Sequence, residues 1–253
     1  MTTTTIGVSL KMYFGHARAL DWIDVVASIA RSHPAIVDSS VELFVIPSYL
    51  AVAESVRRLE GTGVLVGAQD LATADSGAFT GEVSGAELAE VGARVVEVGH
   101  AERRRLFGET DEVVAEKTAA ALRNSLAPVL CIGEESRMTP ADAAAACLAQ
   151  LEHAVAGADP GRLIVAYEPV WAIGAAHPAE ADHIRAVCAE LKTAVASLNG
   201  RDGSVVIYGG SAGPGLLASL GDDVDGLFLG RFAHDPESLR AVLDEAAGRE
   251  VSA

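Results

Sequence analysis

The sequence predicts a single closed (β/α)8 barrel, because short apolar runs recur eight times with helical segments between them. At 253 residues and 50% hydrophobic content, residues 1–253 suit one barrel domain, for which about 250 residues is typical. The runs are rich in β-branched residues and lack strict alternation, as parallel strands buried on both faces do. They are Ile6–Leu10, Leu43–Ile46, Val64–Ala68, Val95–Val98, Pro128–Ile132, Leu163–Tyr167, Val205–Tyr208 and Gly226–Leu229. Helical spacing is clearest in Ala17–Arg31, Asp111–Asn124, Pro140–Ala156 and Pro178–Leu198.

An open, doubly wound sheet is the alternative fold. Such sheets usually have fewer strands and a Gly-rich turn after the first one. Here the first run is followed by Lys11-Met12-Tyr13, and no Pro- or Ser-rich linker divides the chain. We therefore expect one barrel domain.

The composition is strongly acidic, with 35 Asp and Glu against 19 Lys and Arg and a formal net charge of −16. This charge disfavours partners such as nucleic acid and anionic membranes. It would also repel a phosphorylated substrate, so a phosphate site has to be local and built from backbone amides or a few placed cations.

Cysteine usage and the N-terminus predict a cytoplasmic protein. Cys131, Cys147 and Cys188 are widely spaced and form no CxxC pair, so we expect buried, reduced thiols. Met1 is followed by four Thr residues rather than a basic leader, and no apolar stretch approaches the roughly 18 residues that span a membrane.

In a parallel barrel, functional residues lie where the strands end. Lys11, His100 and Glu168 follow the first, fourth and sixth runs, so we expect them at one rim. Taken singly, each has a plain structural explanation: a solvated Lys, a satisfied structural His, or a Glu that caps a helix. The other polar and glycine residues at these ends are Ser9, Gln69, Asp70, Gly99, Gly133, Glu134, Gly209, Gly210, Ser211, Gly230 and Arg231.

The motifs around these residues resemble the triosephosphate isomerase family over nearly the whole chain. The matching pieces are Leu10–Met12, Gly67–Gln69, Gly77–Glu82, Val98–Arg104, Phe107–Thr110, Cys131–Glu134, Ala166–Gly174 and Tyr208–Ser211. The pieces around His100 and Glu168 are long and specific, and all eight occur in the family's order.

The resemblance implies proton transfer without a metal or organic cofactor. It implies that Glu168 removes a proton next to the substrate carbonyl and that His100 polarises this carbonyl as a neutral imidazole, the assignment known for triosephosphate isomerases. Lys11 would stabilise the enediolate and attract the phosphate, and Glu102 would pair with Lys11 in the resting site. Residues 169–171 would be the leading hinge of a loop with its tip at residues 172–176, which closes to exclude water.

The same resemblance implies a phosphate site and a partner. Gly174, Gly210, Ser211 and Gly230 would contribute backbone amides to a small phosphorylated sugar. The segment Gly77–Glu82 resembles the loop that the family inserts into a neighbouring subunit, so a homodimer is expected. A surface loop on a monomer is the alternative.

Four departures from the family pattern bear on the substrate. Ser9-Leu10 replaces the usual Asn-Trp before Lys11, and Ala101 replaces the Ser that usually follows the His. The trailing half of the loop reads Ala175-Ala176-His177-Pro178-Ala179, where Pro178 would stiffen the hinge and His177 replaces a Lys. Gly230-Arg231 replaces Gly-Gly.

Two substrates follow from these departures. If Arg231 points away, the chain interconverts dihydroxyacetone phosphate and glyceraldehyde 3-phosphate. Alternatively, Ser9 and Arg231 resemble the branch acting on four-carbon sugars, L-erythrulose 1-phosphate and D-erythrulose 4-phosphate. The shared catalytic residues place the triose substrate slightly ahead.

Two hypotheses of other classes stay open. The departures at Ser9, Ala101 and Arg231 would also suit a catalytically weak barrel that binds a sugar phosphate. Lys11 would suit a Schiff-base aldolase. Metal catalysis has little support, since the seven His residues show no HxH or HExxH spacing.

Overall fold

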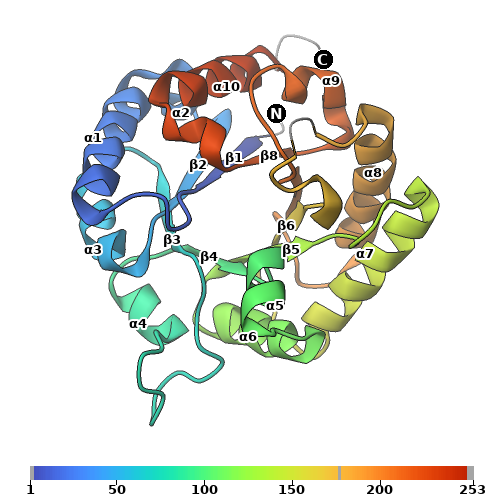
Figure 1. Ribbon diagram of the computed structural model, residues 1–253. Helices are drawn as coiled ribbons and strands as arrows, with labels where there is room; N and C mark the ends of the chain where they lie inside the picture. The colour runs from blue at the N-terminus through green and yellow to red at the C-terminus, as the bar shows by residue number, and fades with distance from the viewer. Residues whose placement is uncertain (1–2, 176–177, 250–253) are drawn as a thin grey trace.

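A computed structural model describes residues 3–175 and 178–249 and shows a closed barrel of eight parallel strands (Figure 1). Each strand pairs with its neighbours in sequence, and β8 closes the barrel on β1. The predicted barrel is thus confirmed, with strand ends shifted by at most two residues. The strands are β1 Thr4–Ser9, β2 Val41–Ile46, β3 Leu65–Ala68, β4 Val95–Val98, β5 Ala127–Ile132, β6 Ile164–Tyr167, β7 Val205–Tyr208 and β8 Gly226–Leu229.

Helices surround the barrel on its outer side (Figure 1). The α-helices are α1 His16–Ser32, α2 Pro34–Val37, α3 Tyr49–Arg58, α4 Gly85–Glu90, α5 Ala101–Phe107, α6 Asp111–Arg123, α7 Pro140–Val155, α8 Ala181–Ser197, α9 Leu216–Leu220 and α10 Pro236–Gly248. Three 3-10 turns are η1 Val170–Ala172, η2 Gly221–Asp223 and η3 Arg231–His234. No helix among the described residues is long and apolar enough to cross a membrane.

One predicted helix boundary was wrong. Helical spacing suggested a start at Pro178, but α8 begins at Ala181 after an extended Glu180. The backbone N–H of Ala179 donates a hydrogen bond to the Tyr208 hydroxyl at 3.2 Å. Tertiary contact with β7 therefore keeps this segment in the loop.

The apolar core has two parts, because alternate residues of each strand face opposite sides of the barrel wall. The barrel interior holds Phe44, Ile46, Val95, Val129, Cys131, Ile164, Ala166, Ile207 and Phe228. The larger part, which includes Val96 and Val98, packs between the strands and the helices. On β4 this alternation leaves Glu97 on the interior face with Val95.

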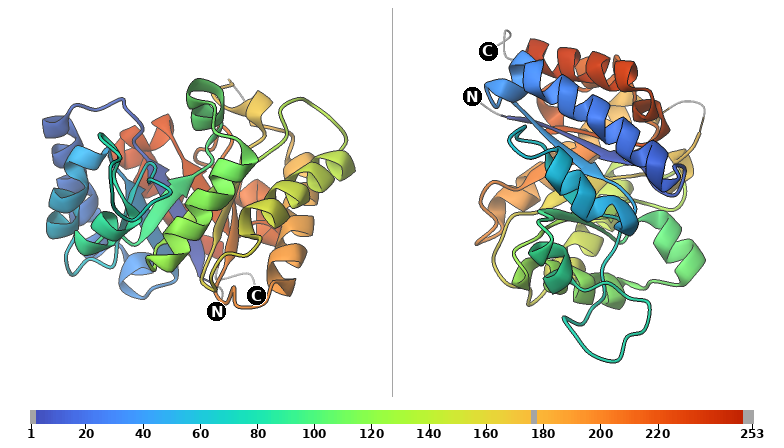
Figure 2. Two further views of the ribbon diagram at one scale, coloured as in Figure 1. Left: turned by 90° about the horizontal axis from the view of Figure 1, so that it is seen from below. Right: turned by 90° about the vertical axis from the view of Figure 1, so that its left-hand side faces the viewer.

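The connection between β3 and α4 projects away from the barrel (Figures 1 and 2). It contains the predicted segment Gly77–Glu82, where Gly77 and Gly81 have φ values of +130° and +95° that favour glycine. Phe79 at its tip is 51% exposed.

Candidate active site

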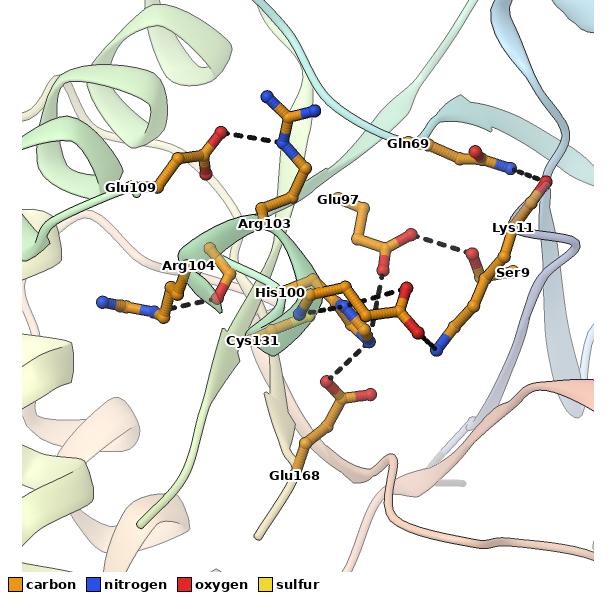
Figure 3. Close-up of polar contacts among 12 residues, drawn as sticks. Ser9, Lys11, Gln69, Glu97, His100, Arg103, Arg104, Glu109, Cys131 and Glu168 are labelled. Carbon is orange, nitrogen blue, oxygen red and sulfur yellow. Dashed lines mark hydrogen bonds and ion pairs between the residues drawn. The ribbon is translucent and has the colours of Figure 1, made fainter. Parts of the chain in front are cut away.

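The barrel brings the three predicted residues Lys11, His100 and Glu168 together at one rim (Figure 3). His100 Nε2 lies 3.4 Å from Glu168 Oε2. Lys11 Nζ lies 3.0 Å from Oε1 of Glu102, the predicted resting partner. The ends of β1, β4 and β6 thus converge as the parallel topology requires.

Lys11 has a strained backbone. Its φ of +47° is in the left-handed region that residues other than glycine rarely adopt. The Gln69 side-chain amide donates a hydrogen bond to the Lys11 carbonyl at 2.8 Å and fixes this conformation. Strain of this kind concentrates where a side chain has to be aimed at a site.

His100 is held as a neutral imidazole with a defined tautomer. Its Nδ1 accepts a hydrogen bond from the backbone N–H of Glu102 at the start of α5, at 3.1 Å. The ring proton therefore lies on Nε2, which faces Glu168. Burial, and next the positive charge of Lys11, lower the pKa of His100 to about 4.

Glu168 is a buried carboxyl whose Oε2 has no hydrogen-bond partner among the described residues. Burial, and next the nearby charge of Glu97, raise its pKa to about 8. The neighbouring glycines make room for it: a Cβ on Gly209 would lie 2.5 Å from Glu168 Oε1, and one on Gly133 would lie 2.0 Å from the Glu168 carbonyl oxygen. A carboxyl with a raised pKa and an oxygen that accepts no hydrogen bond is suited to accept a proton near neutral pH.

Glu97 joins Lys11, Glu102, His100 and Glu168 as a fifth acidic or basic group in the site, and sequence reasoning missed it. Ser9 Oγ donates a hydrogen bond to Glu97 Oε2 at 2.9 Å, and Glu97 Oε1 lies 4.0 Å from His100 Nε2. Burial raises the pKa of Glu97 to about 7. The signal was one carboxylate inside the apolar run Val95–Val98, but the run did not show which way it faces.

A cavity of about 640 Å³ opens beside these groups. The predicted substrate-binding residues that line it are Lys11, Gly174, Gly210, Ser211, Gly230 and Arg231. Ser9, His100 and Glu168 are instead buried, each 5% exposed or less. The Gly210 turn allows no side chain, since a Cβ there would lie 2.2 Å from the Tyr208 hydroxyl oxygen.

Sequence reasoning also missed Arg105 and Tyr13 in the cavity wall. Arg105 comes from α5, and Arg231 Cζ lies 6.0 Å from the centre of the Tyr13 ring. Lys11, Arg105 and Arg231 outnumber the one carboxylate in the cavity wall, that of Glu102, although the protein as a whole is acidic. This arrangement suits an anionic ligand.

The loop after β6 packs against the cavity. The Ser211 hydroxyl lies 3.0 Å from the Ala172 carbonyl oxygen and 2.9 Å from that of Ala175. At the leading hinge, the Trp171 indole N–H donates a hydrogen bond to Glu134 Oε1 at 2.8 Å. Ala176 and His177, part of the predicted tip and trailing half of this loop, lie outside the described residues.

Asp70, at the end of β3, belongs to a separate charged network. Lys117 Nζ lies 2.6 Å from a carboxylate oxygen of Asp70 and 2.6 Å from one of Glu109. Arg103 contacts the same two carboxylates at 2.7 and 2.8 Å. This network joins the end of β3 to α5 and α6.

Comparisons with known proteins bear directly on this site. The family model described as triosephosphate isomerase matches residues 4–246. The chain belongs to the triosephosphate isomerase family. The protein is therefore an isomerase, as the named members of this family are.

Individual relatives of this family carry two different names. An L-erythrulose-1-phosphate isomerase of Pectobacterium atrosepticum is 54% identical over 96% of this chain and 95% of its own. Another, of Mesorhizobium japonicum, is 40% identical over 96% of each chain. A triosephosphate isomerase of Symbiobacterium thermophilum is 42% identical over 83% of this chain and 85% of its own.

Proposed function

We propose that the protein interconverts L-erythrulose 1-phosphate and D-erythrulose 4-phosphate by proton transfer through an enediolate. The observation that carries the chemistry is the buried Glu168 carboxyl, whose Oε2 accepts no hydrogen bond from the described residues and lies 3.4 Å from the N–H-bearing nitrogen of His100. The similarity to the relative that is 54% identical supports the four-carbon substrate, as does the combination of Ser9 with Arg231.

In L-erythrulose 1-phosphate the carbonyl is at C2, so the proton to be moved is on C3. Glu168 takes the C3 proton, and the electron pair of the broken C–H bond forms the enediolate double bond between C2 and C3. His100 donates a hydrogen bond from Nε2 to the carbonyl oxygen, which gains negative charge. Return of the proton to C2, together with movement of the C3 hydroxyl proton to the C2 oxygen, leaves the carbonyl at C3 and gives the same skeleton numbered from its other end.

Lys11 and Glu102 complete this assignment. The Lys11 ammonium group would stabilise the enediolate and the phosphate dianion, and it would exchange its contact with Glu102 for the substrate. Preorganised charge of this kind lowers the transition-state energy most in a site that excludes water.

The phosphate would bind at the turns after β7 and β8. Gly210, Ser211 and Gly230 line the cavity there, and η3 begins directly after Gly230. Barrel enzymes frequently bind phosphate at this position. Gly174 lines the cavity from the loop after β6 and would add a further amide.

The triose substrate remains a second candidate. A relative that is 42% identical is named triosephosphate isomerase, and the groups proposed to move the proton do not depend on a fourth carbon. In this case Arg231 would be tolerated beside the phosphate.

The test is kcat/KM on L-erythrulose 1-phosphate and on glyceraldehyde 3-phosphate with the same purified protein. We expect brisk turnover of the tetrulose and a triose value lower by a factor of about 1,000 or more. A triose value near the diffusional ceiling of about 10⁸ M⁻¹s⁻¹ would contradict the proposal and establish the second candidate. Absence of turnover on both would favour a binding protein.

We also propose a homodimer in which the segment Gly77–Glu82 enters a neighbouring subunit. Its projection from the barrel and the exposed ring of Phe79 support this assembly (Figure 2). Sedimentation equilibrium, which measures molar mass in solution, distinguishes the dimer from a monomer with a free surface loop.

A further inference from the structure

Ser9 and Glu97 form a polar pair where a barrel interior is normally apolar. The interior cluster below them consists of residues such as Ile46, Val95 and Cys131. Ser9 and Glu97 are 2% and 4% exposed, and their side chains lie 2.9 Å apart. A buried carboxyl is costly unless its surroundings compensate for the lost water, so its presence here calls for a function.

The pair has hydrogen-bonding capacity left over. The single hydroxyl proton of Ser9 is used in the bond to Glu97 Oε2, while the Ser9 oxygen keeps lone pairs free. Glu97 Oε1 lies 4.0 Å from His100 Nε2, which is beyond hydrogen-bond range. A substrate hydroxyl that reaches this pair would therefore find partners.

The pair also lies at a defined place relative to the reacting groups (Figure 3). Glu168 packs against Gly209, next to the proposed phosphate turn, and contacts His100 on its other side. His100 Nε2 in turn faces Glu97, which binds Ser9. The contacts thus run from the turn after β7, through Glu168 and His100, to Glu97 on β4, and Glu97 binds Ser9 on β1, the strand that pairs with β8.

The two candidate substrates differ at one end of the carbon skeleton, the end away from the phosphate. With the phosphate at the turn after β7, the two carbons that exchange the proton lie beside Glu168 and His100. L-Erythrulose 1-phosphate is dihydroxyacetone phosphate with one further hydroxymethyl group, and this group is attached on the side away from the phosphate. Ser9 is also shorter than the Asn that the family usually has there.

We propose that Ser9 and Glu97 form the subsite that binds the terminal hydroxymethyl group of the four-carbon substrate. The pair thereby sets the preference for a tetrulose phosphate over a triose phosphate. This inference rests on the proposed function and assigns specificity to residues distinct from Arg231 at the cavity mouth. A site built to bond a hydroxyl discriminates strongly against a substrate that lacks it, because its buried polar groups are then left unpaired.

The experiment compares Ser9→Ala and Glu97→Gln with the wild type on L-erythrulose 1-phosphate and glyceraldehyde 3-phosphate. We expect the ratio of the two kcat/KM values to move toward the triose by about 10- to 100-fold in each variant. Ser55→Ala is the matched control, because Ser55 is a fully buried hydroxyl on α3 remote from the rim. It should leave the ratio unchanged. Thermal melting of each variant verifies that it is folded.

A binding measurement separates this inference from the proposed function. In a Glu168→Gln background, which prevents turnover, calorimetry gives the Kd of L-erythrulose 1-phosphate and of dihydroxyacetone phosphate. Adding Ser9→Ala should weaken tetrulose binding at least about 10-fold more than triose binding. Equal weakening of both ligands would overturn the subsite and assign the pair to positioning His100, and no weakening of either would also overturn it. If the wild type turns over only the triose, the proposed substrate fails, while the calorimetry still decides whether the subsite exists.

Discussion

Two clusters of buried and half-buried charged groups differ in their balance of positive and negative charge. Around Lys11, one ammonium group is set against the three carboxyls of Glu97, Glu102 and Glu168. In the network of Asp70, Arg103, Glu109 and Lys117, two cations face two carboxylates at 2.6 to 2.8 Å.

The difference in balance shows in the pKa values. In the rim cluster, burial and mutual repulsion raise the pKa of Glu168 to about 8, and burial raises that of Glu97 to about 7. In the network, burial alone would raise the pKa of Glu109, but hydrogen bonds from Lys117 and Arg103 lower it. Burial still raises the pKa of Asp70, in spite of Lys117.

We conclude that burial raises carboxyl pKa values in both clusters and that the surplus of negative charge adds to this effect at Glu168, in the proposed reactive cluster. Burial and the surplus together keep Glu168 ready to hold a proton near neutral pH. The balanced network instead connects elements of the fold. Three changes test this distinction.

The largest effect is expected from Lys117→Met, which removes a cation from the balanced network. Asp70 and Glu109 would each lose a buried partner, so the free energy of unfolding should fall by about 3–5 kcal/mol. Denaturant unfolding measures it, with Lys192→Met as the control, since Lys192 is a more exposed lysine paired with Asp225. The control should cost at most about 1 kcal/mol. A loss equally small for Lys117→Met would show that the network does not stabilise the fold.

Glu168→Asp should lower kcat by about 100-fold while KM changes little, because shortening the side chain moves the base by about 1 Å. This loss corresponds to about 2.7 kcal/mol in the activation free energy. Steady-state kinetics with the preferred substrate give both constants. An unaltered kcat would remove Glu168 from the proposed role.

The smallest effect is expected in the pH profile of Glu97→Gln. The proposed mechanism needs ionised Glu168 as the base, so kcat/KM should rise with pH as its carboxyl loses a proton. The variant removes a negative charge that raises the pKa of Glu168, although burial, Lys11, Glu102 and Cys131 still act on it. The rising limb should therefore shift to lower pH. A limb that stays in place would show that Glu97 is not coupled to the base.

Much of the fold and of the candidate site could be predicted from the sequence, because both follow from the order of the strand segments along the chain. Eight apolar runs in sequence specify eight neighbouring parallel strands, and the ends of these strands lie at one rim. Lys11, His100 and Glu168 follow such ends directly, so their convergence needs no knowledge of side-chain packing. The start of α8 was missed because the contact of Ala179 with Tyr208 is between segments far apart in the chain.

By itself the sequence determined the barrel, the rim, and the glycine turns and Arg231 around the cavity. Only the tertiary structure decided that Glu97 faces inward, since a strand buried on both faces has no polar alternation to reveal its sides. It also decided that Arg105 reaches the cavity from α5. The raised pKa values of Glu168 and Glu97 also follow from the tertiary structure. Both carboxyls lose water because residues from several strands of the barrel pack around them.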